Sequence, residues 1–223
     1  MRIKLANVGK RFNREWIFRH LDFTFQSAIP YAITGPNGSG KSTLLQIIAG
    51  ATIFNEGDIE YFADDKKLLP ENVYANISIA APYLELVEEM TLTEFLQFHS
   101  TLKKWLPGFD TQKIISTINL EDAAKKQIRY FSSGMKQRVK LAQAILSDVA
   151  LILLDEPCTN LDEEGIKLYK KLMNEYCKNR LLIVSSNDIE EYDFCKEILE
   201  ISNYKNSALQ QNNNQAINFQ PKE

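Results

Sequence analysis

Cysteine and histidine are scarce in this chain. Its 223 residues include only three cysteines and two histidines. Cys158, Cys177 and Cys195 are odd in number and widely spaced, so they predict neither a disulfide framework nor a zinc site. We expect cytosolic thiols, with Cys158 packed. His99 lies on the apolar face of an expected helix without a second candidate ligand, so we expect it to pack rather than to bind a metal.

Long apolar runs are also missing. No stretch approaches the ~18 consecutive apolar residues of a membrane span, so a role at a membrane would need a separate partner chain. The net charge of −3, from 26 basic and 29 acidic residues, implies no general attraction to nucleic acid. The first residues, MRIKLANV, have the pattern of a strand rather than of a signal peptide. The length suffices for one sizeable core, and no internal repeat is present.

Glycine is limited to nine residues, but three of them fall within one short turn. Residues 31–43 read YAITGPNGSGKST and fit the phosphate-binding pattern G-x-x-x-x-G-K-[ST]. The pattern predicts a strand, a turn whose bare backbone N–H groups surround phosphate oxygens, and a helix over about 41–49. Lys41 would reach the β- and γ-phosphates, and the Ser42 hydroxyl would bind Mg²⁺. The residues expected to bind ATP here are Gly35, Pro36, Asn37, Gly38, Ser39, Gly40, Lys41, Ser42 and Thr43.

Two carboxylates follow the longest apolar run of the chain. Residues 149–154 read VALILL, which is typical of a strand buried on both faces, and Asp155 and Glu156 come directly after it. Unpaired buried charges are costly, so this acidic pair is poorly explained by core packing. Asp155 could hold the Mg²⁺ that bridges the phosphates, and Glu156 could orient or deprotonate a water molecule.

A capped helix is predicted shortly before the acidic strand. Residues 131–138 read FSSGMKQR, and apolar residues then recur with helical spacing. Ser132 or Ser133 could cap this helix, whose N-terminus is a further potential anion site. Taken alone, this segment would be an ordinary capped helix.

Strands alternate with helices along the chain, which predicts an α/β fold with a parallel sheet. Strands are expected over 2–8, 15–25 and 57–62, so an antiparallel layer should be attached to that sheet. A helix is predicted over 91–106, with Thr91 and Glu94 as a capping box and Leu92, Phe95, Leu96, His99 and Leu102 on its apolar face. Residues 110–130 are expected to be helical.

In combination these segments resemble the ATP-binding cassette of ABC transporters over roughly residues 1–202. The resemblance implies a P-loop NTPase (RecA-like) core with an antiparallel β subdomain and a helical subdomain at about 83–130. FSSGM stands where the family has its L-S-G-G-Q signature, with Ser132 and Gly134 retained to face the γ-phosphate. TNLD at 159–162 resembles the family's D-loop, and this resemblance implies that Asp162 lies at the nucleotide. Phe12 is implied to stack on adenine, with Trp16 as a second candidate.

Several positions depart from the family's pattern. Within the signature, Ser133 and Met135 replace the usual Gly and Gln. Asn187, in SSNDIEE after the strand expected at 181–185, occupies the place of the switch histidine. Asn can donate a hydrogen bond to the γ-phosphate but cannot carry a proton or a charge. The stretch 77–86 contains no Gln to sense Mg²⁺ and water, and Pro82 stands near the expected position. Binding of ATP is therefore better supported than efficient hydrolysis.

The resemblance implies an ATP-hydrolysing subunit that works as a two-fold dimer with a second copy or a homologous cassette. It also implies an integral membrane permease subunit as partner and a cytoplasmic location on the inner face of the membrane. Tyr83, Leu84, Phe98 and Trp105 are candidates for the docking surface. The alternatives are a nucleotide-gated regulatory clamp with little turnover, and a soluble ABC ATPase that acts on ribosomes or DNA. A P-loop kinase or GTPase fits least well.

The last segment, residues 203–223, differs in composition from the rest. Ten of its residues are Asn or Gln, including the run QQNNNQ at 210–215. A segment of this composition buries little apolar surface, so we expect it to be disordered or loosely attached.

Overall fold

The computed structural model describes residues 1–205 of the chain. A 3₁₀ helix, η4 (Ile201–Tyr204), spans the boundary expected at residue 202, which stays a prediction. Ile201 is fully buried and Tyr204 packs against the same core, so apolar contacts hold this turn on the domain. Most of the tail predicted at 203–223 lies outside the described residues.

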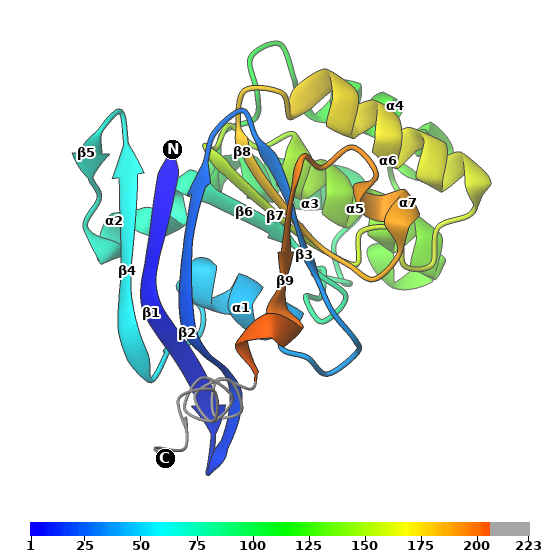
Figure 1. Ribbon diagram of the computed structural model, residues 1–223. Helices are drawn as coiled ribbons and strands as arrows, with labels where there is room; N and C mark the ends of the chain where they lie inside the picture. Colours follow the sequence, from blue (N-terminus) through cyan, green and yellow to red (C-terminus); the bar gives the residue numbers. More distant parts are fainter. Residues whose placement is uncertain (206–223) are drawn as a thin grey trace, which may run out of the picture.

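A five-stranded parallel sheet forms the centre of the fold (Figure 1). Its order is β6-β7-β8-β3-β9, and every neighbouring pair is parallel. Side chains of β7 alternate between two cores. Leu151 and Leu153 join the core on the side of the P-loop helix, whereas Ile152 and Leu154 join the core beneath the helical part. The uninterrupted apolar run is thus explained by burial on both faces. The strands are β6 (Ile77–Ala80), β7 (Leu151–Asp155), β8 (Leu181–Ser185), β3 (Pro30–Thr34) and β9 (Glu197–Glu200).

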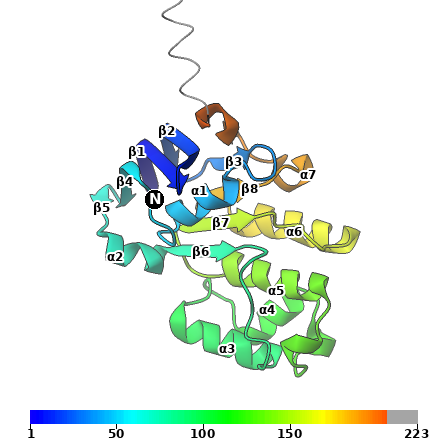
Figure 2. The same cartoon turned by 90° about the horizontal axis from the view of Figure 1, so that it is seen from below.

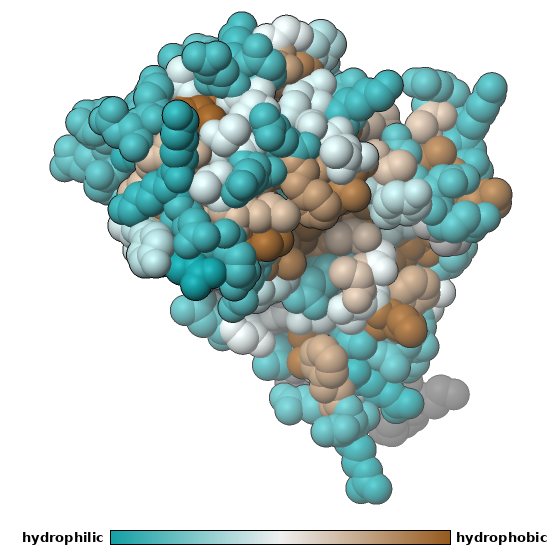
Figure 3. All heavy atoms as spheres, turned by 180° about the vertical axis from the view of Figure 1, so that it is seen from behind, coloured by the Kyte–Doolittle hydropathy of each residue, from teal (hydrophilic) through white to brown (hydrophobic). Residues whose placement is uncertain are grey.

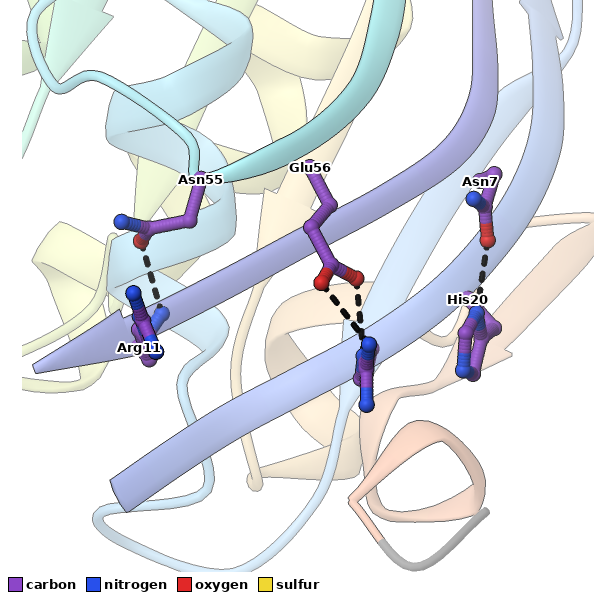
Figure 4. Close-up of polar contacts among 6 residues, drawn as sticks. Asn7, Arg11, His20, Asn55 and Glu56 are labelled. Carbon is purple, nitrogen blue, oxygen red and sulfur yellow. Dashed lines mark hydrogen bonds and ion pairs between the residues drawn. The ribbon is translucent and has the colours of Figure 1, made fainter. Parts of the chain in front are cut away.

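An antiparallel sheet of order β2-β1-β4-β5 packs beside this centre, as predicted. Polar contacts cross it (Figure 4): the Asn55 and Asn7 amides point to β1 and β2, and the Glu56 carboxylate of β4 reaches over β1 to β2. Glu56 accepts two hydrogen bonds from Arg19, at 2.7 and 2.8 Å. Asn55 Oδ1 accepts from the Arg11 backbone N–H at 2.9 Å. The strands are β1 (Arg2–Phe12), β2 (Glu15–Gln26), β4 (Glu56–Ala63) and β5 (Lys66–Lys67).

The helix α1 (Lys41–Ile48) lies between the two sheets (Figure 2). Leu44, Leu45 and Ile48 are fully buried among residues of both sheets. On the other side of the parallel sheet lie α5 (Ser133–Ile145) and α6 (Glu163–Tyr176), with α3 (Leu92–Leu102) and α4 (Thr111–Thr117) beyond them (Figure 2). The helix at the P-loop is therefore packed between the two sheets.

The helical part differs in detail from its prediction. The capping box of Thr91 and Glu94 is present, but α3 ends at Leu102 instead of 106. Beyond it the chain turns back to α5, where the Leu106 N–H donates to the Leu146 carbonyl at 2.8 Å. Leu102 is 67% exposed, so its assignment to the apolar face was wrong. Residues 110–130 contain only α4 and the 3₁₀ turns η2 (Glu121–Ala123) and η3 (Ile128–Tyr130).

His99 and Trp105 are packing residues. The His99 ring lies 4.5 Å from the Trp105 ring, centroid to centroid, and its Nε2 lies 2.8 Å from the Ser147 hydroxyl. Burial, followed by the charge of Lys103, lowers the pKa of His99 to about 4. Trp105 is partly buried and packs against the helical core, and its place among the docking candidates stays a prediction.

The remaining elements are short. They are α2 (Pro70–Val73), η1 (Tyr74–Asn76) and α7 (Ile189–Tyr192). Among residues 1–205, every helix is too short or too polar to cross a membrane.

Candidate functional site

The P-loop joins the end of β3 to the start of α1. Gly40 has a φ of 104°, and a Cβ there would lie 2.3 Å from Ile17 Cγ2 of β2, so only glycine fits. No side chain caps the N-terminus of α1. Its first N–H groups and the positive end of the helix dipole are thus available to an anion.

Lys41 lies inside this loop. Its side chain is buried, and its ammonium donates to the Gly35 carbonyl at 2.8 Å and to the Pro36 carbonyl at 3.4 Å. These bonds hold a positive charge at the N-terminus of α1. A phosphate bound there would therefore meet backbone donors and an ammonium group together.

A cavity of about 370 Å³ opens at the P-loop. It brings together the end of β1, strand β2, the loop and the residue that follows β7. Lys41 and Glu156 provide its two charges. The residues lining it are Phe12, Ile17, Asn37, Gly38, Gly40, Lys41, Ser42, Thr43 and Glu156. Of the other predicted loop residues, Ser39 is buried, while Gly35 and Pro36 supply the carbonyls that hold Lys41.

The acidic pair lies at the carboxyl end of β7. Asp155 is 2% exposed, and its Oδ1 has no hydrogen-bond partner among the described residues. A buried carboxylate oxygen without a donor is costly unless a cation or another ligand completes it. Mg²⁺ is commonly held by one or two protein oxygens together with substrate phosphates, so Asp155 and the hydroxyl of Ser42 suit this ion.

Glu156 has an unusual backbone conformation. Its φ is 44°, in the left-handed region that non-glycine residues rarely adopt, and its N–H donates to the Ser185 carbonyl at 2.8 Å. This turn directs Glu156 into the cavity at the P-loop while Asp155 stays buried. The two carboxylates therefore have different surroundings, which suits two different roles.

Asn187 contacts the P-loop directly. It follows β8, and its Nδ2 donates to Asn37 Oδ1 at 2.8 Å. The preceding Ser186 N–H donates to the Ile33 carbonyl of β3 at 3.2 Å. The neutral residue that stands in the histidine's place is thus positioned beside the phosphate-binding turn.

Of the two aromatic candidates for adenine, only Phe12 lines the cavity. It is 51% exposed at the end of β1, with Lys10 Nζ 4.6 Å from its ring centroid. Ile17 faces the P-loop at Gly40. Its neighbour Trp16 therefore points to the opposite face, where it packs beside Arg19 and Gly9. The structure does not bring Trp16 to this cavity.

The signature segment lies elsewhere, beside the D-loop. The Ser132 hydroxyl caps α5 and accepts from the Met135 N–H at 3.2 Å, which resolves the choice of cap. A Cβ at Gly134 would lie 3.0 Å from the Asn160 carbonyl. Among the described residues, the lining of the P-loop cavity includes neither Ser132 nor Gly134.

Asp162 has a local role in the described structure. Its carboxylate caps α6 by accepting from the Gly165 N–H at 2.8 Å, and it pairs with Arg138 at 3.1 Å. The hydrogen bond from Gly165 is the main cause of the lowered pKa of Asp162. Asp162 is not among the described residues that line the P-loop cavity.

Two buried residues that the sequence did not indicate hold the segment after Glu156. Glu191 of α7 accepts from the Cys158 N–H at 2.7 Å, and burial raises the pKa of Glu191. Gln137 of α5 donates to the Pro157 carbonyl at 2.7 Å. Both contacts join residues that are distant in sequence, so no contiguous motif could have predicted them. Cys158 itself packs against the helical core, as expected.

The site and fold define a P-loop nucleotide-binding protein, and comparison with known proteins gives its family. A family model described as "ABC transporter" matches residues 18–159. This chain therefore belongs to the ABC transporter family and is one of its ATP-binding proteins, as the resemblance implied.

Relatives and solved structures agree with this assignment. The uncharacterized ABC transporter ATP-binding protein YybJ of Bacillus subtilis is 29% identical over 208 residues, which cover 90% of this chain and 92% of YybJ. The cytochrome c biogenesis ATP-binding export protein CcmA of Aliivibrio fischeri is 29% identical over 201 residues, which cover 85% and 97%. A putative ABC transporter ATP-binding protein from Pyrococcus furiosus has the same fold, with a TM-score of 0.76, 20% identity and coverages of 92% and 99%. The dimeric bacterial ABC transporter cassette MJ0796 gives a TM-score of 0.72, 24% identity and coverages of 90% and 95%.

Proposed function

We propose that this chain hydrolyses ATP to power a membrane transporter, and that ATP binding closes it against a second copy or a homologous cassette. One observation supports this most. The lining of the cavity at the P-loop contains the buried cation of Lys41 and the carboxylate of Glu156, and the buried Asp155 directly precedes Glu156 as the last residue of β7. A phosphate-binding cation and a carboxylate facing the same space are what hydrolysis of a phosphoanhydride requires.

The roles within one subunit follow from position. The α1 N-terminus and Lys41 would hold the β- and γ-phosphates. Phe12 would stack on the adenine ring. Glu156 would orient or deprotonate the attacking water, and Asn187 would donate to a γ-phosphate oxygen. Asp155 and Ser42 would hold Mg²⁺, which neutralises phosphate charge when it is bound.

The second half of the site would come from the partner cassette. Ser132 and Gly134 begin α5 but do not line their own chain's P-loop cavity. Exposed N–H groups at this helix start, offered by a second copy, would complete the γ-phosphate site. The D-loop with Asp162 lies against the same segment and would meet the dimer interface.

The proposed membrane partner would dock on the helical subdomain, at about residues 83–130. A groove of about 270 Å³ lies between the loop after β6, α3 and α5, and Leu84, Leu102 and Lys140 are among its lining residues. Phe98 of α3 and Tyr83, which directly precedes Leu84, are 44% and 45% exposed. Figure 3 shows hydrophobic residues gathered in a hollow on this side of the molecule. Through this surface the chain would sit on the inner, cytoplasmic face of a membrane.

The replacement of Glu156 by Gln tests the proposal. Removing a general base typically costs ~10²–10⁴-fold in rate, so phosphate release should fall by about this factor. ATP should still bind, because Lys41 and the loop are untouched, and the chain should then run as a dimer in size-exclusion chromatography with Mg-ATP. Glu164→Gln, an exposed carboxylate on α6, is the matched control and should retain turnover. Full activity of the Glu156 variant would refute the assignment of the base.

A regulatory clamp with little turnover is the second candidate. The neutral Asn187 beside Asn37 favours it, as does Pro82, whose carbonyl accepts from Lys140 at 3.1 Å in the place of a Gln side chain. ATP-dependent dimerisation of the unmodified chain without measurable phosphate release would support the clamp. Steady turnover would support the ATPase. A soluble ABC ATPase outside transport has no specific observation in its favour.

A further inference from the structure

A second cavity, of about 480 Å³, lies at the other end of the parallel sheet from the P-loop. Pro30 and Leu182, paired at the start of β3 and β8, form part of its wall. The P-loop and Asn187 follow the opposite ends of these same strands. The two cavities are therefore separate, and their volumes are both in or near the range of ~300–1,000 Å³ that is usual for small-molecule sites.

The floor of this second cavity is apolar. Met173, Cys177 and Leu182 are each no more than 5% exposed, and Phe194 packs against the same core. Met173 Sδ and Cys177 Sγ are 3.9 Å apart. Thioether, thiol and aromatic groups are polarizable, and methionine adapts its shape readily to an apolar ligand.

The rim of the cavity is cationic, although the chain as a whole has a net charge of −3. Lys170, Lys178, Arg180 and Lys196 line it, with Asp193 as the one carboxylate. Asp193 is paired with Lys170 at 2.9 Å. Arg180 is held by backbone carbonyls, including that of Ser147 at 2.9 Å.

Lys178 and Lys196 differ from Lys170 and Arg180 in having no side-chain partner among the described residues. Both are exposed, and neither forms an ion pair or a side-chain hydrogen bond within the described part of the chain. Two unpaired cations beside an apolar hollow are complementary to a ligand with one negative head group and an apolar body.

We propose that this cavity, lined by α6, the start of β8 and the segment 193–196, binds a small amphipathic anion such as a medium-chain carboxylate. The apolar body lies on Met173, Cys177 and Phe194, and the head group lies between Lys178 and Lys196. The site is independent of the nucleotide site, so binding requires neither ATP nor turnover.

Calorimetric titration of the full chain with sodium decanoate, below the concentration at which it forms micelles, tests this proposal. We expect one decanoate per chain. The double variant Lys178→Gln/Lys196→Gln should bind at least about tenfold more weakly, since the loss of even one charge-assisted hydrogen bond accounts for about that factor. Lys167→Gln/Lys171→Gln removes the same charge from exposed positions of α6 that are not in the lining, and should bind like the unmodified chain.

Two further ligands separate the contribution of the charged head group to binding from that of the apolar body. Decanol, which lacks the charge, and inorganic phosphate, which lacks the apolar body, should each bind far more weakly than decanoate. Asn174→Trp, at an exposed lining position, should block decanoate while leaving the melting temperature and ATP affinity unchanged. Equal decanoate affinity in the rim variant, the plugged variant and the unmodified chain would overturn the site, as would several equivalent sites per chain. Lys41→Ala should leave decanoate affinity intact, so a failure of the ATPase proposal remains distinguishable.

Discussion

The P-loop side and the signature side of this chain are built in different ways. The P-loop side gathers β1, β2, the loop and the residue after β7 around one cavity, and every contact is made within the chain. On the signature side, Ser132 caps a helix and Gly134 lies against the D-loop, apart from that cavity. The first half lies within one chain, whereas in the proposed dimer the second would act only against the other cassette. Variants on the two sides should therefore separate ATP binding from dimer closure.

The largest expected effect comes from Lys41→Ala. Affinity for Mg-ATP, measured by calorimetry on the monomer, should fall about a hundredfold to ten-thousandfold, because two or more charge-assisted hydrogen bonds of roughly 1.5–3 kcal/mol each are lost. Ser132→Gly is the matched variant on the signature side. Glycine is tolerated as a helix cap at a cost of only a few tenths of a kcal/mol, so monomer affinity should be unchanged while ATP-dependent dimerisation weakens. Equal affinities of the two variants for Mg-ATP would contradict the proposed difference between the two sides.

The next largest effect on ATP affinity is expected from the loss of Phe12, the aromatic residue proposed to stack on adenine. Phe12→Ala should weaken ATP affinity about tenfold or somewhat more, since a stacked base is worth roughly 1–3 kcal/mol. Trp16→Ala should leave affinity unchanged, because Ile17 and not Trp16 faces the P-loop. Calorimetry with both variants decides between the two aromatics. A larger loss from Trp16→Ala would reverse the assignment.

A smaller effect is expected on the P-loop side, at Asn187, which contacts Asn37. Asn187→His should raise phosphate release about tenfold, because a charged donor roughly doubles the strength of a hydrogen bond to phosphate. The variant also loses the bond from Asn187 to Asn37, so ATP affinity must be measured beside turnover. A slower enzyme with normal ATP affinity would show that this site is adapted to Asn.

Contiguous patterns allowed the P-loop side to be predicted closely. The glycine turn, Lys41 and the helix after it lie within one short segment, so backbone geometry alone sets their positions. Strand β7, which ends in Asp155 and is followed by Glu156, was predictable because an apolar run without alternation is typical of a strand buried on both faces. The roles assigned to these residues remain predictions.

Contacts between segments distant in sequence account for the features that could not be predicted from the sequence. Helix α3 ends early because Leu106 bonds to Leu146. Trp16 faces away from the P-loop because of strand alternation in β2, which depends on a register that the sequence does not display. Glu191 and Gln137 bond to backbone groups 33 and 20 residues away, and any buried polar residue could have done so.

The smallest effect on the isolated chain is expected at Phe98 of helix α3, and Phe95 on the same helix is the buried control. Phe95 is 5% exposed and Phe98 is 44% exposed. Phe95→Glu should lower the melting temperature strongly, because it buries an unpaired charge in the helical core. Phe98→Glu should change the free energy of unfolding by no more than about 0.5 kcal/mol, as is usual for surface substitutions, and should leave ATP affinity unchanged. If Phe98 lies in the docking surface, the same variant should lose the membrane subunit in a pull-down that the unmodified chain passes. A Phe98→Glu chain that melts early would make Phe98 a packing residue. A stable chain that keeps its membrane partner would place the docking surface elsewhere, because a buried carboxylate at an apolar interface is costly to both partners.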